Sequence, residues 1–206
     1  KEDIKKCKEN GVDYLFLPTN EVLYKNNFAS YVNVEKLSSI MCALSRPQHF
    51  RGVTTIVSKL FNITLADKAY FGLKDYQQYV IIKKMAEDLN FKTKVIGCPI
   101  VRQKSGLALS SRNTYLSEKA AEDASGISKI LQNAKKMFSL SKNISEVVKY
   151  AEKALEQIPE SRVEYVQARD ADTLDPAKDS TKKILLAVAV RIQNVRLIDN
   201  IVFKGE

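Results

Sequence analysis

The fold is indicated most clearly by residues 70–78, Tyr-Phe-Gly-Leu-Lys-Asp-Tyr-Gln-Gln. The apolar residues before Gly72 are typical of a buried strand end, and those after it of a helix with Lys74 and Asp75 in its first turn. A second segment, Leu-Ala-Leu-Ser-Ser-Arg-Asn at residues 107–113, is typical of an exposed loop that offers two hydroxyls and a guanidinium. A helix N-terminus presents free N–H groups to an anion, so the two segments together predict a phosphate-binding cleft.

Strand and helix patterns alternate from the N-terminus to about Pro99. The chain begins within a predicted amphipathic helix that has Ile4 and Cys7 on its inner side. Further apolar patterns predict strands at residues 12–17, 31–34, 68–71 and 94–98, and helices at residues 52–65 and 75–89. This β-α-β order predicts a parallel sheet with helical crossovers. Ligands bind beyond the carboxyl ends of such strands, which is where Gly72 lies.

The pattern changes after Pro99. Ser117 and Ser145 are predicted to cap two helices, one over residues 118–138 and one that ends near Pro159. Three strands with short connections follow, at residues 163–169, 183–191 and 195–203, which favours a small antiparallel sheet. The sequence therefore predicts an α/β protein in which a Rossmann-type parallel sheet (residues 1–99) precedes a smaller α+β domain (residues 100–206).

Composition narrows the classes of function. An apolar fraction of 45% in 206 residues excludes a disordered chain. The net charge of +9 is compatible with nucleic acid, an anionic membrane or small charged substrates as partners. Because the basic residues are scattered, mostly as lysines on helix patterns, a solvated lysine-rich surface is favoured, with neither nucleic acid nor membrane as partner.

The cysteines predict a reducing environment. Cys7, Cys42 and Cys98 lie far apart without paired spacing, so the sequence suggests neither a disulfide framework nor a zinc site. The longest apolar run, residues 184–190, is too short to span a bilayer. We therefore expect a cytoplasmic protein without a metal site of its own.

Each motif taken alone also has a structural explanation. A strand-glycine-helix turn with a lysine is often plain turn chemistry. Serines before an arginine often form a polar loop or a cap. His49 is the single histidine, and an isolated histidine before a helix is as often a hydrogen-bonding residue as a catalyst. Gln77 and Gln78 could be solvent-facing amides, although Gln78 could also reach the ligand end of the sheet.

Several segments, taken together, resemble one family, the pantoate-β-alanine ligases, also called pantothenate synthetases. The resemblance covers essentially the whole chain. It rests on residues 46–53 (Arg-Pro-Gln-His-Phe-Arg-Gly-Val), 71–78, 97–102 (Gly-Cys-Pro-Ile-Val-Arg), 106–113, 167–170 (Gln-Ala-Arg-Asp) and 196–200 (Arg-Leu-Ile-Asp-Asn), in the family's order and spacing.

This resemblance implies a two-domain enzyme of the cytidylyltransferase-like nucleotidyltransferase superfamily. Its Rossmann-type domain binds ATP and pantoate, and its smaller domain closes over the site. ATP, with Mg²⁺, adenylates the carboxylate of pantoate, and β-alanine then attacks the adenylate to give pantothenate and AMP. A homodimer is also implied.

The resemblance assigns roles to individual residues. Lys74 and Arg112 are expected to be catalytic through their positive charge, and Gln78 is expected to bind pantoate. Arg46 and His49 are possible substrate-binding residues near pantoate or β-alanine. The expected ATP-binding residues are Gly72, Leu73, Lys74, Asp75, Val101, Leu109, Ser110, Ser111 and Arg112.

Two departures from the family pattern stand out. Leu73 occupies a position where the family usually has glutamate, which is tolerable if that position contributes mainly its backbone. The family's His-x-Gly-His type motif, its first pantoate-binding glutamine and the acidic segment near magnesium are absent. The expectation is therefore the larger, C-terminal portion of such an enzyme, inactive by itself. The alternative is a non-catalytic binding or interaction module that retains the fold.

Overall fold

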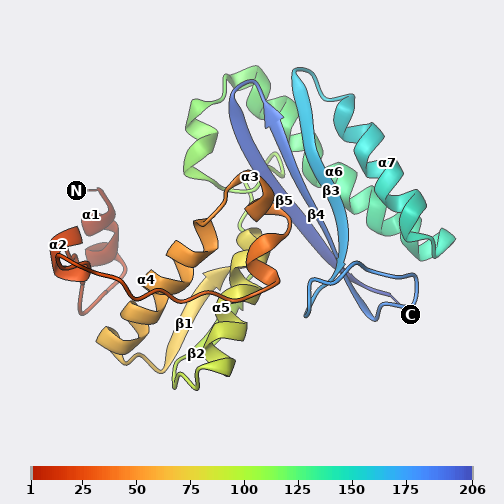
Figure 1. Ribbon diagram of the computed structural model, residues 1–206. Coiled ribbons are helices and arrows are strands. Elements are labelled where there is room, and N and C mark those ends of the chain that lie inside the picture. The colour runs from red at the N-terminus through yellow and green to blue at the C-terminus, as the bar shows by residue number, and fades with distance from the viewer. Residues whose placement is uncertain (1, 206) are drawn as a thin grey trace. The chain divides into compact units, whose positions relative to one another are not determined.

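The computed structural model describes residues 2–205, and the chain separates into two compact units, Lys1–Tyr31 and Val32–Glu206 (Figure 1). The first unit contains α1 (Glu2–Glu9) and α2 (Asn20–Leu23). Ion pairs one turn apart, such as Lys6 Nζ to Glu2 Oε1 at 2.9 Å, support α1. The predicted helix is confirmed for the described residues, with Lys1 outside them. Its predicted inner side is wrong, because no residue of α1 is buried.

The strand predicted at residues 12–17 is wrong. These residues form no strand and lie between α1 and α2, with 93% of Tyr14 and 66% of Leu17 exposed. An apolar run becomes a strand only where a neighbouring strand accepts and donates its backbone hydrogen bonds. Residues 12–17 have no such ladder in the described structure.

The second unit contains the predicted parallel β-α-β arrangement. Strand β1 (Lys68–Gly72) pairs in parallel with β2 (Lys94–Cys98), with Lys68 opposite Lys94 and Gly72 opposite Cys98. The crossover consists of a 3-10 turn, η2 (Leu73–Asp75), and helix α5 (Tyr76–Asp88). This arrangement confirms the α/β fold class and places Gly72 at the carboxyl end of its strand.

Helix α4 (His49–Thr64) packs with α5 over this small sheet. Their shared core contains Val57 and Phe61 from α4 and Ile82 and Met85 from α5, as the helical periodicity predicts. Leu89, the last residue of the helix predicted at residues 75–89, is 53% exposed, because α5 ends at Asp88.

The strand predicted at residues 31–34 is also wrong. Instead of pairing with a strand, Val32 donates its N–H to Thr55 Oγ1 at 3.0 Å and accepts from Thr54 Oγ1 at 2.6 Å. Two threonine hydroxyls of α4 therefore satisfy the backbone groups that a sheet would otherwise pair.

Helices α6 (Glu118–Ser141) and α7 (Ile144–Glu156) lie along one face of a three-stranded antiparallel sheet (Figure 1). The predicted Ser117 cap is confirmed, because its hydroxyl accepts from Ala120 N at 3.2 Å. The predicted Ser145 cap is wrong. Asn143 caps α7 instead, with its side-chain oxygen 3.1 Å from Glu146 N.

The antiparallel sheet has the order β3 (Ser161–Asp170), β4 (Lys183–Ile192), β5 (Val195–Lys204). Ile184 and Leu186 of β4 face the α6–α7 core, while Leu185 and Ala187 pack in a second cluster with Tyr76 of α5. Burial on both faces explains why the sequence of β4 is a continuous apolar run. This second cluster joins α5 to the antiparallel sheet within one compact unit, and the domain boundary near residue 100 stays a prediction.

Within residues 2–205, no helix combines the length and the apolar character needed to cross a membrane.

Candidate active site

The first half of the site is the turn between β1 and α5. The sequence predicted Lys74 and Asp75 in the first turn of the α-helix. They lie instead in η2, directly before α5. The Asp75 side chain makes no capping hydrogen bond to α5, so holding the helix start is not its role. A Cβ atom added to Gly72 would meet no atom within 4 Å, so the space beside this backbone is open.

The second half is the segment from Val101 to Tyr115. Residues 101–109 form a tight hairpin in which Gln103 N donates to Leu107 O at 2.8 Å and Leu109 N to Val101 O at 2.9 Å. Gly106 adopts φ +96° at its turn, a conformation that favours glycine. A 3-10 turn, η3 (Ser111–Tyr115), follows, and Ser110 Oγ accepts from Arg112 N at 3.3 Å as its cap.

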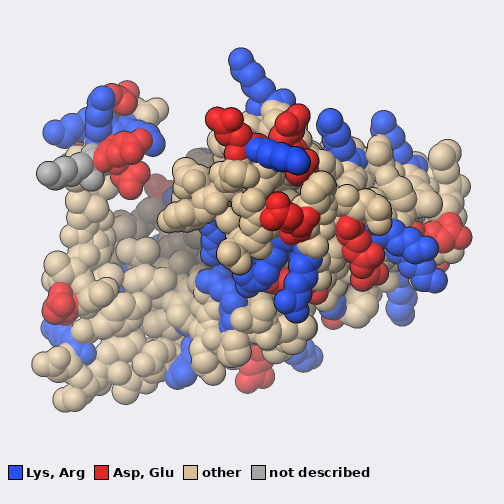
Figure 2. Space-filling view, turned by 90° about the horizontal axis from the view of Figure 1, so that it is seen from above, with Lys and Arg blue, Asp and Glu red and all other residues tan. Residues whose placement is uncertain are grey.

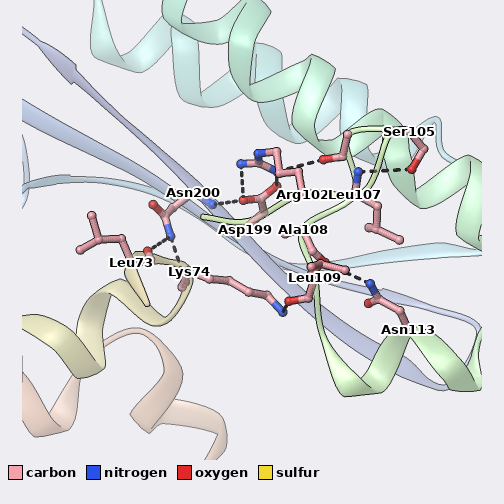
Figure 3. Close-up of polar contacts among 11 residues, drawn as sticks. Leu73, Lys74, Arg102, Ser105, Leu107, Ala108, Leu109, Asn113, Asp199 and Asn200 are labelled. Atoms are coloured by element: carbon pink, nitrogen blue, oxygen red, sulfur yellow. Dashed lines mark hydrogen bonds and ion pairs between the residues drawn. The ribbon is translucent and has the colours of Figure 1, made fainter. Parts of the chain in front are cut away.

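The two halves meet at Lys74, whose Nζ atom donates to the carbonyl oxygen of Leu109 at 3.2 Å (Figure 3). Lys74, Ser110 and Arg112 line one cleft of about 200 Å³. The other predicted site residues that line it are Arg46, His49, Asp75 and Gln78. The structure thus brings together residues from three separate sequence motifs.

Some predicted site residues do not line this cleft. Ser111 is exposed, and Val101 and Leu109 leave 66% and 49% of their surfaces in solvent. Gly72 and Leu73 directly precede Lys74 in the sequence but are not among the residues that line the cleft.

Positive charge and partial burial set the protonation states in the cleft. Burial lowers the pKa of Lys74, the carboxylates of Asp75 and Asp199 oppose that shift, and Arg112 adds to it. Burial also lowers the pKa of His49, and the nearby Arg46 charge lowers it further. His49 is therefore a neutral imidazole near pH 7, able to accept a proton or a hydrogen bond.

A further polar group, not predicted from the sequence, lines the cleft. Arg196 Nε donates to Glu164 Oε2 at 2.7 Å, and its Nη2 atom lies 3.7 Å from Cys42 Sγ. Cys42 Sγ is also 3.2 Å from the hydroxyl of Tyr165. Burial would raise the pKa of Glu164, but hydrogen bonds and charge from Arg196 and Arg191 lower it overall.

Gln77 and Gln78 have different roles although they are adjacent. Gln77 is buried, accepts from Cys42 N at 3.1 Å and donates to the carbonyl oxygens of Leu37 and Ile40 at 2.9 and 2.8 Å. It therefore ties α5 to η1 (Leu37–Ser39) and α3 (Cys42–Ser45), and the expectation of a solvent-facing amide is wrong for it. Gln78 lines the cleft.

Among residues 2–205, no three His, Cys, Asp or Glu side chains are grouped closely enough to hold a metal ion. Mg²⁺ commonly binds through one or two carboxylates together with nucleotide phosphates and water. The exposed carboxylate of Asp75 at the cleft is compatible with that mode.

A parallel β-α-β unit with cations gathered at the carboxyl end of its strand is an arrangement typical of α/β proteins that bind phosphate-bearing ligands. Comparison with known proteins narrows this class. The profile of the pantoate-beta-alanine ligase family matches residues 1–202. The chain belongs to this family.

Curated relatives and solved structures support the same family assignment. The chain is 46% identical over 201 residues to the pantothenate synthetase of Endomicrobium trichonymphae, covering 98% of this chain and 71% of the relative. It is 47% identical over 195 residues to that of Moorella thermoacetica, covering 94% and 69%. The crystal structure of pantothenate synthetase from Thermus thermophilus superposes with a TM-score of 0.92 at 38% identity, covering 97% of this chain and 73% of that one.

A further solved structure carries ligands. The pantoate-beta-alanine ligase from Francisella tularensis, complexed with beta-gamma ATP and beta-alanine, matches with a TM-score of 0.74 at 34% identity, covering 98% of this chain and 69% of that one.

Proposed function

We propose that this chain takes part in the ATP-dependent condensation of pantoate with β-alanine to give pantothenate, through a pantoyl-adenylate intermediate. The observation that carries this proposal is the meeting of Lys74 with Ser110 and Arg112 across one cleft, in a chain of the pantoate-β-alanine ligase family. Adenylation moves negative charge onto the α-phosphoryl group and the leaving pyrophosphate. Oriented cations stabilise such charge more in the transition state than in the ground state.

The ATP site is proposed to span both halves of the cleft. Lys74 supplies a mobile point charge and Arg112 a planar fork, and both act on the transferring and leaving phosphates. The hydroxyls of Ser110 and Ser111 and the open backbone at Gly72 provide further contacts for phosphate oxygens. We propose that the rest of the ATP molecule is contacted by Leu73, Asp75, Val101 and Leu109. Mg²⁺ is proposed to arrive with the phosphates, near Asp75.

The acid and amine substrates are proposed to occupy the deeper part of the cleft. Gln78 offers an amide that can donate to the pantoate carboxylate or hydroxyls. Arg46 supplies a charge for the carboxylate of pantoate or β-alanine. His49, neutral because burial and Arg46 lower its pKa, can accept a proton from the ammonium group of β-alanine, which leaves the neutral amine that attacks the adenylate.

We also propose a cytoplasmic homodimer without nucleic acid as partner. Cys7, Cys42 and Cys98 are all free thiols, which suits a reducing compartment. On the face drawn in Figure 2, Lys and Arg side chains are interrupted by Asp, Glu and uncharged residues. Light scattering measures the oligomeric state, and salt-sensitive binding to duplex or single strands would contradict the absence of a nucleic-acid partner.

The test is ATP–pyrophosphate exchange in the presence of pantoate. The 206 residues include one histidine and so no His-x-Gly-His motif, and we propose that the chain alone shows no exchange. A fusion protein, in which the segment of a family member that carries this motif precedes residue 1, is expected to show pantoate-dependent exchange.

Two results would count against the proposal. Robust exchange by the 206-residue chain would overturn its proposed inactivity. A folded fusion protein without pantoate-dependent exchange would favour the alternative, a non-catalytic module that retains the fold.

A further inference from the structure

Two neighbouring residues of β5, Asp199 and Asn200, line the wall of the cleft and contact both of its halves. Each is only 5% exposed. Successive side chains of a strand leave it on opposite faces, so two adjacent residues can hold two different segments. Figure 3 shows Asn200 directed at the η2 turn and Asp199 at the guanidinium of Arg102.

Asn200 holds the turn that carries Lys74. Its Nδ2 atom donates to the carbonyl oxygens of Leu73 and Lys74, each at 2.9 Å. Only the amide nitrogen can satisfy two carbonyl acceptors, so a carboxylate of the same shape could not replace it. Asn200 therefore sets the direction in which the Lys74 backbone presents its side chain.

Asp199 holds the hairpin that ends at Leu109. Its carboxylate accepts from Arg102 Nη1 at 2.6 Å and from Arg102 Nη2 at 2.9 Å, a two-pronged ion pair. Arg102 Nη1 also donates to Gly106 O at 3.1 Å, across the hairpin turn. A third bond, from Asn200 N to Asp199 Oδ1 at 2.8 Å, keeps the carboxylate in place.

We infer that Asp199 and Asn200 are positioning residues that set the spacing of the two phosphate-binding segments. Asn200 places η2, Asp199 places the hairpin through Arg102, and the Lys74 Nζ to Leu109 O hydrogen bond joins them on the cleft side. Neither residue needs to touch a reacting atom for this role. The inference adds positioning residues to the proposed site, and its catalytic consequence rests on the proposed function.

Hydrogen–deuterium exchange on the 206-residue chain tests the placement without any ligand. Asn200→Asp keeps the shape but loses both donated hydrogen bonds, and Asn200→Ala removes the amide. Both are expected to speed exchange in residues 72–80 about tenfold, the change that corresponds to roughly 1.4 kcal/mol of local stability. Asp199→Asn and Arg102→Lys are expected to speed exchange in residues 101–109 instead.

Val202→Ala is the matched control, because Val202 lies on the same face of β5 as Asn200 and packs in the cluster with Tyr76. It loosens packing without removing a bond to η2. The inference is overturned if residues 72–80 exchange at the parent rate in both Asn200 variants, or if Val202→Ala accelerates them equally.

The fusion protein tests the catalytic consequence. Asn200→Asp is expected to lower kcat for ATP–pyrophosphate exchange about tenfold while KM for pantoate stays within about twofold, since only the phosphate-binding turn is misplaced. An unchanged kcat with accelerated deuterium exchange would overturn the positioning role. If the parent fusion protein shows no pantoate-dependent exchange, the proposed function fails, and the deuterium measurement still decides how the two segments are held.

Discussion

The Nζ atom of Lys74 lies 3.2 Å from the carbonyl oxygen of Leu109, 35 residues further along the chain. This hydrogen bond joins a turn after a parallel strand to a hairpin that belongs to another part of the sequence. Within residues 2–205 Lys74 is held at the cleft by one neutral carbonyl acceptor, and burial lowers its pKa. Such a lysine is easily redirected to a phosphate, which is a stronger partner than a neutral carbonyl.

Lys74→Ala is therefore expected to impair catalysis without impairing folding. In the fusion protein, the exchange rate should fall roughly 10²–10³-fold, the scale of losing one oriented charge stabiliser. The melting temperature should stay nearly unchanged. Lys83→Ala is the control, because Lys83 lies on α5 in an exposed pair with Glu87 and away from the cleft. Exchange at the parent rate in Lys74→Ala would refute the catalytic role.

The same substitution should lower stability at Gln77 and weaken pantoate binding at Gln78. Gln77→Leu removes three part-buried hydrogen bonds, to Cys42 N, Leu37 O and Ile40 O, and is expected to lower the free energy of unfolding by about 3 kcal/mol. Gln78→Leu should change it by less than about 0.5 kcal/mol, yet raise KM for pantoate in the fusion protein. Denaturant titration and exchange kinetics measure the two effects, and equal destabilisation would contradict the separation of roles.

The stability contributed by His49 should depend on pH. Its pKa in the folded protein is lowered below the ordinary value of 6.5, so the unfolded chain binds the proton more readily. The folded state therefore loses stability as the pH falls from above 6.5 through the lowered pKa. His49→Gln removes this dependence. The difference in free energy of unfolding between variant and parent should shift in favour of the variant between about pH 7.5 and about pH 5.5, and a constant difference would contradict it.

Capping of α7 provides a paired test of local structure. Asn143→Ala removes the acceptor for Glu146 N and should cost about 1 kcal/mol of folding free energy. Ser145→Ala changes an exposed residue inside the helix and should stay within about 0.5 kcal/mol. Thermal unfolding of both variants measures the difference, and a larger loss for Ser145→Ala would restore the sequence-based assignment of the cap.

Local patterns were sufficient for much of the fold. Helical spacing identified α4 and α5, an apolar run marked the strand β4, and Ser117 marked the start of α6. These features depend on residues within a few positions of one another, so a single segment contains the whole signal. Residues 12–17 show where this fails, because an apolar run does not reveal whether a strand is available to pair with it.

The candidate site, like the fold, could be predicted from the sequence only in part. The motifs at residues 46–53, 71–78 and 106–113 contain several of the side chains that line the cleft, and the resemblance of the whole series to one family was visible from the sequence. The structural role of Gln77 was not visible from the sequence, since its hydrogen-bond partners lie 35 to 40 residues away in segments without a regular pattern.

The sequence by itself determined the secondary structure of the β-α-β unit, the α/β class and the family, because periodicity and motif order are local and additive. The tertiary structure alone decided that Asp199 and Asn200 hold the two halves of the cleft. Their partners lie 97 and about 127 positions away. Hydrogen bonds between such distant groups exist only after both sheets have folded and packed, so no spacing in the sequence encodes them.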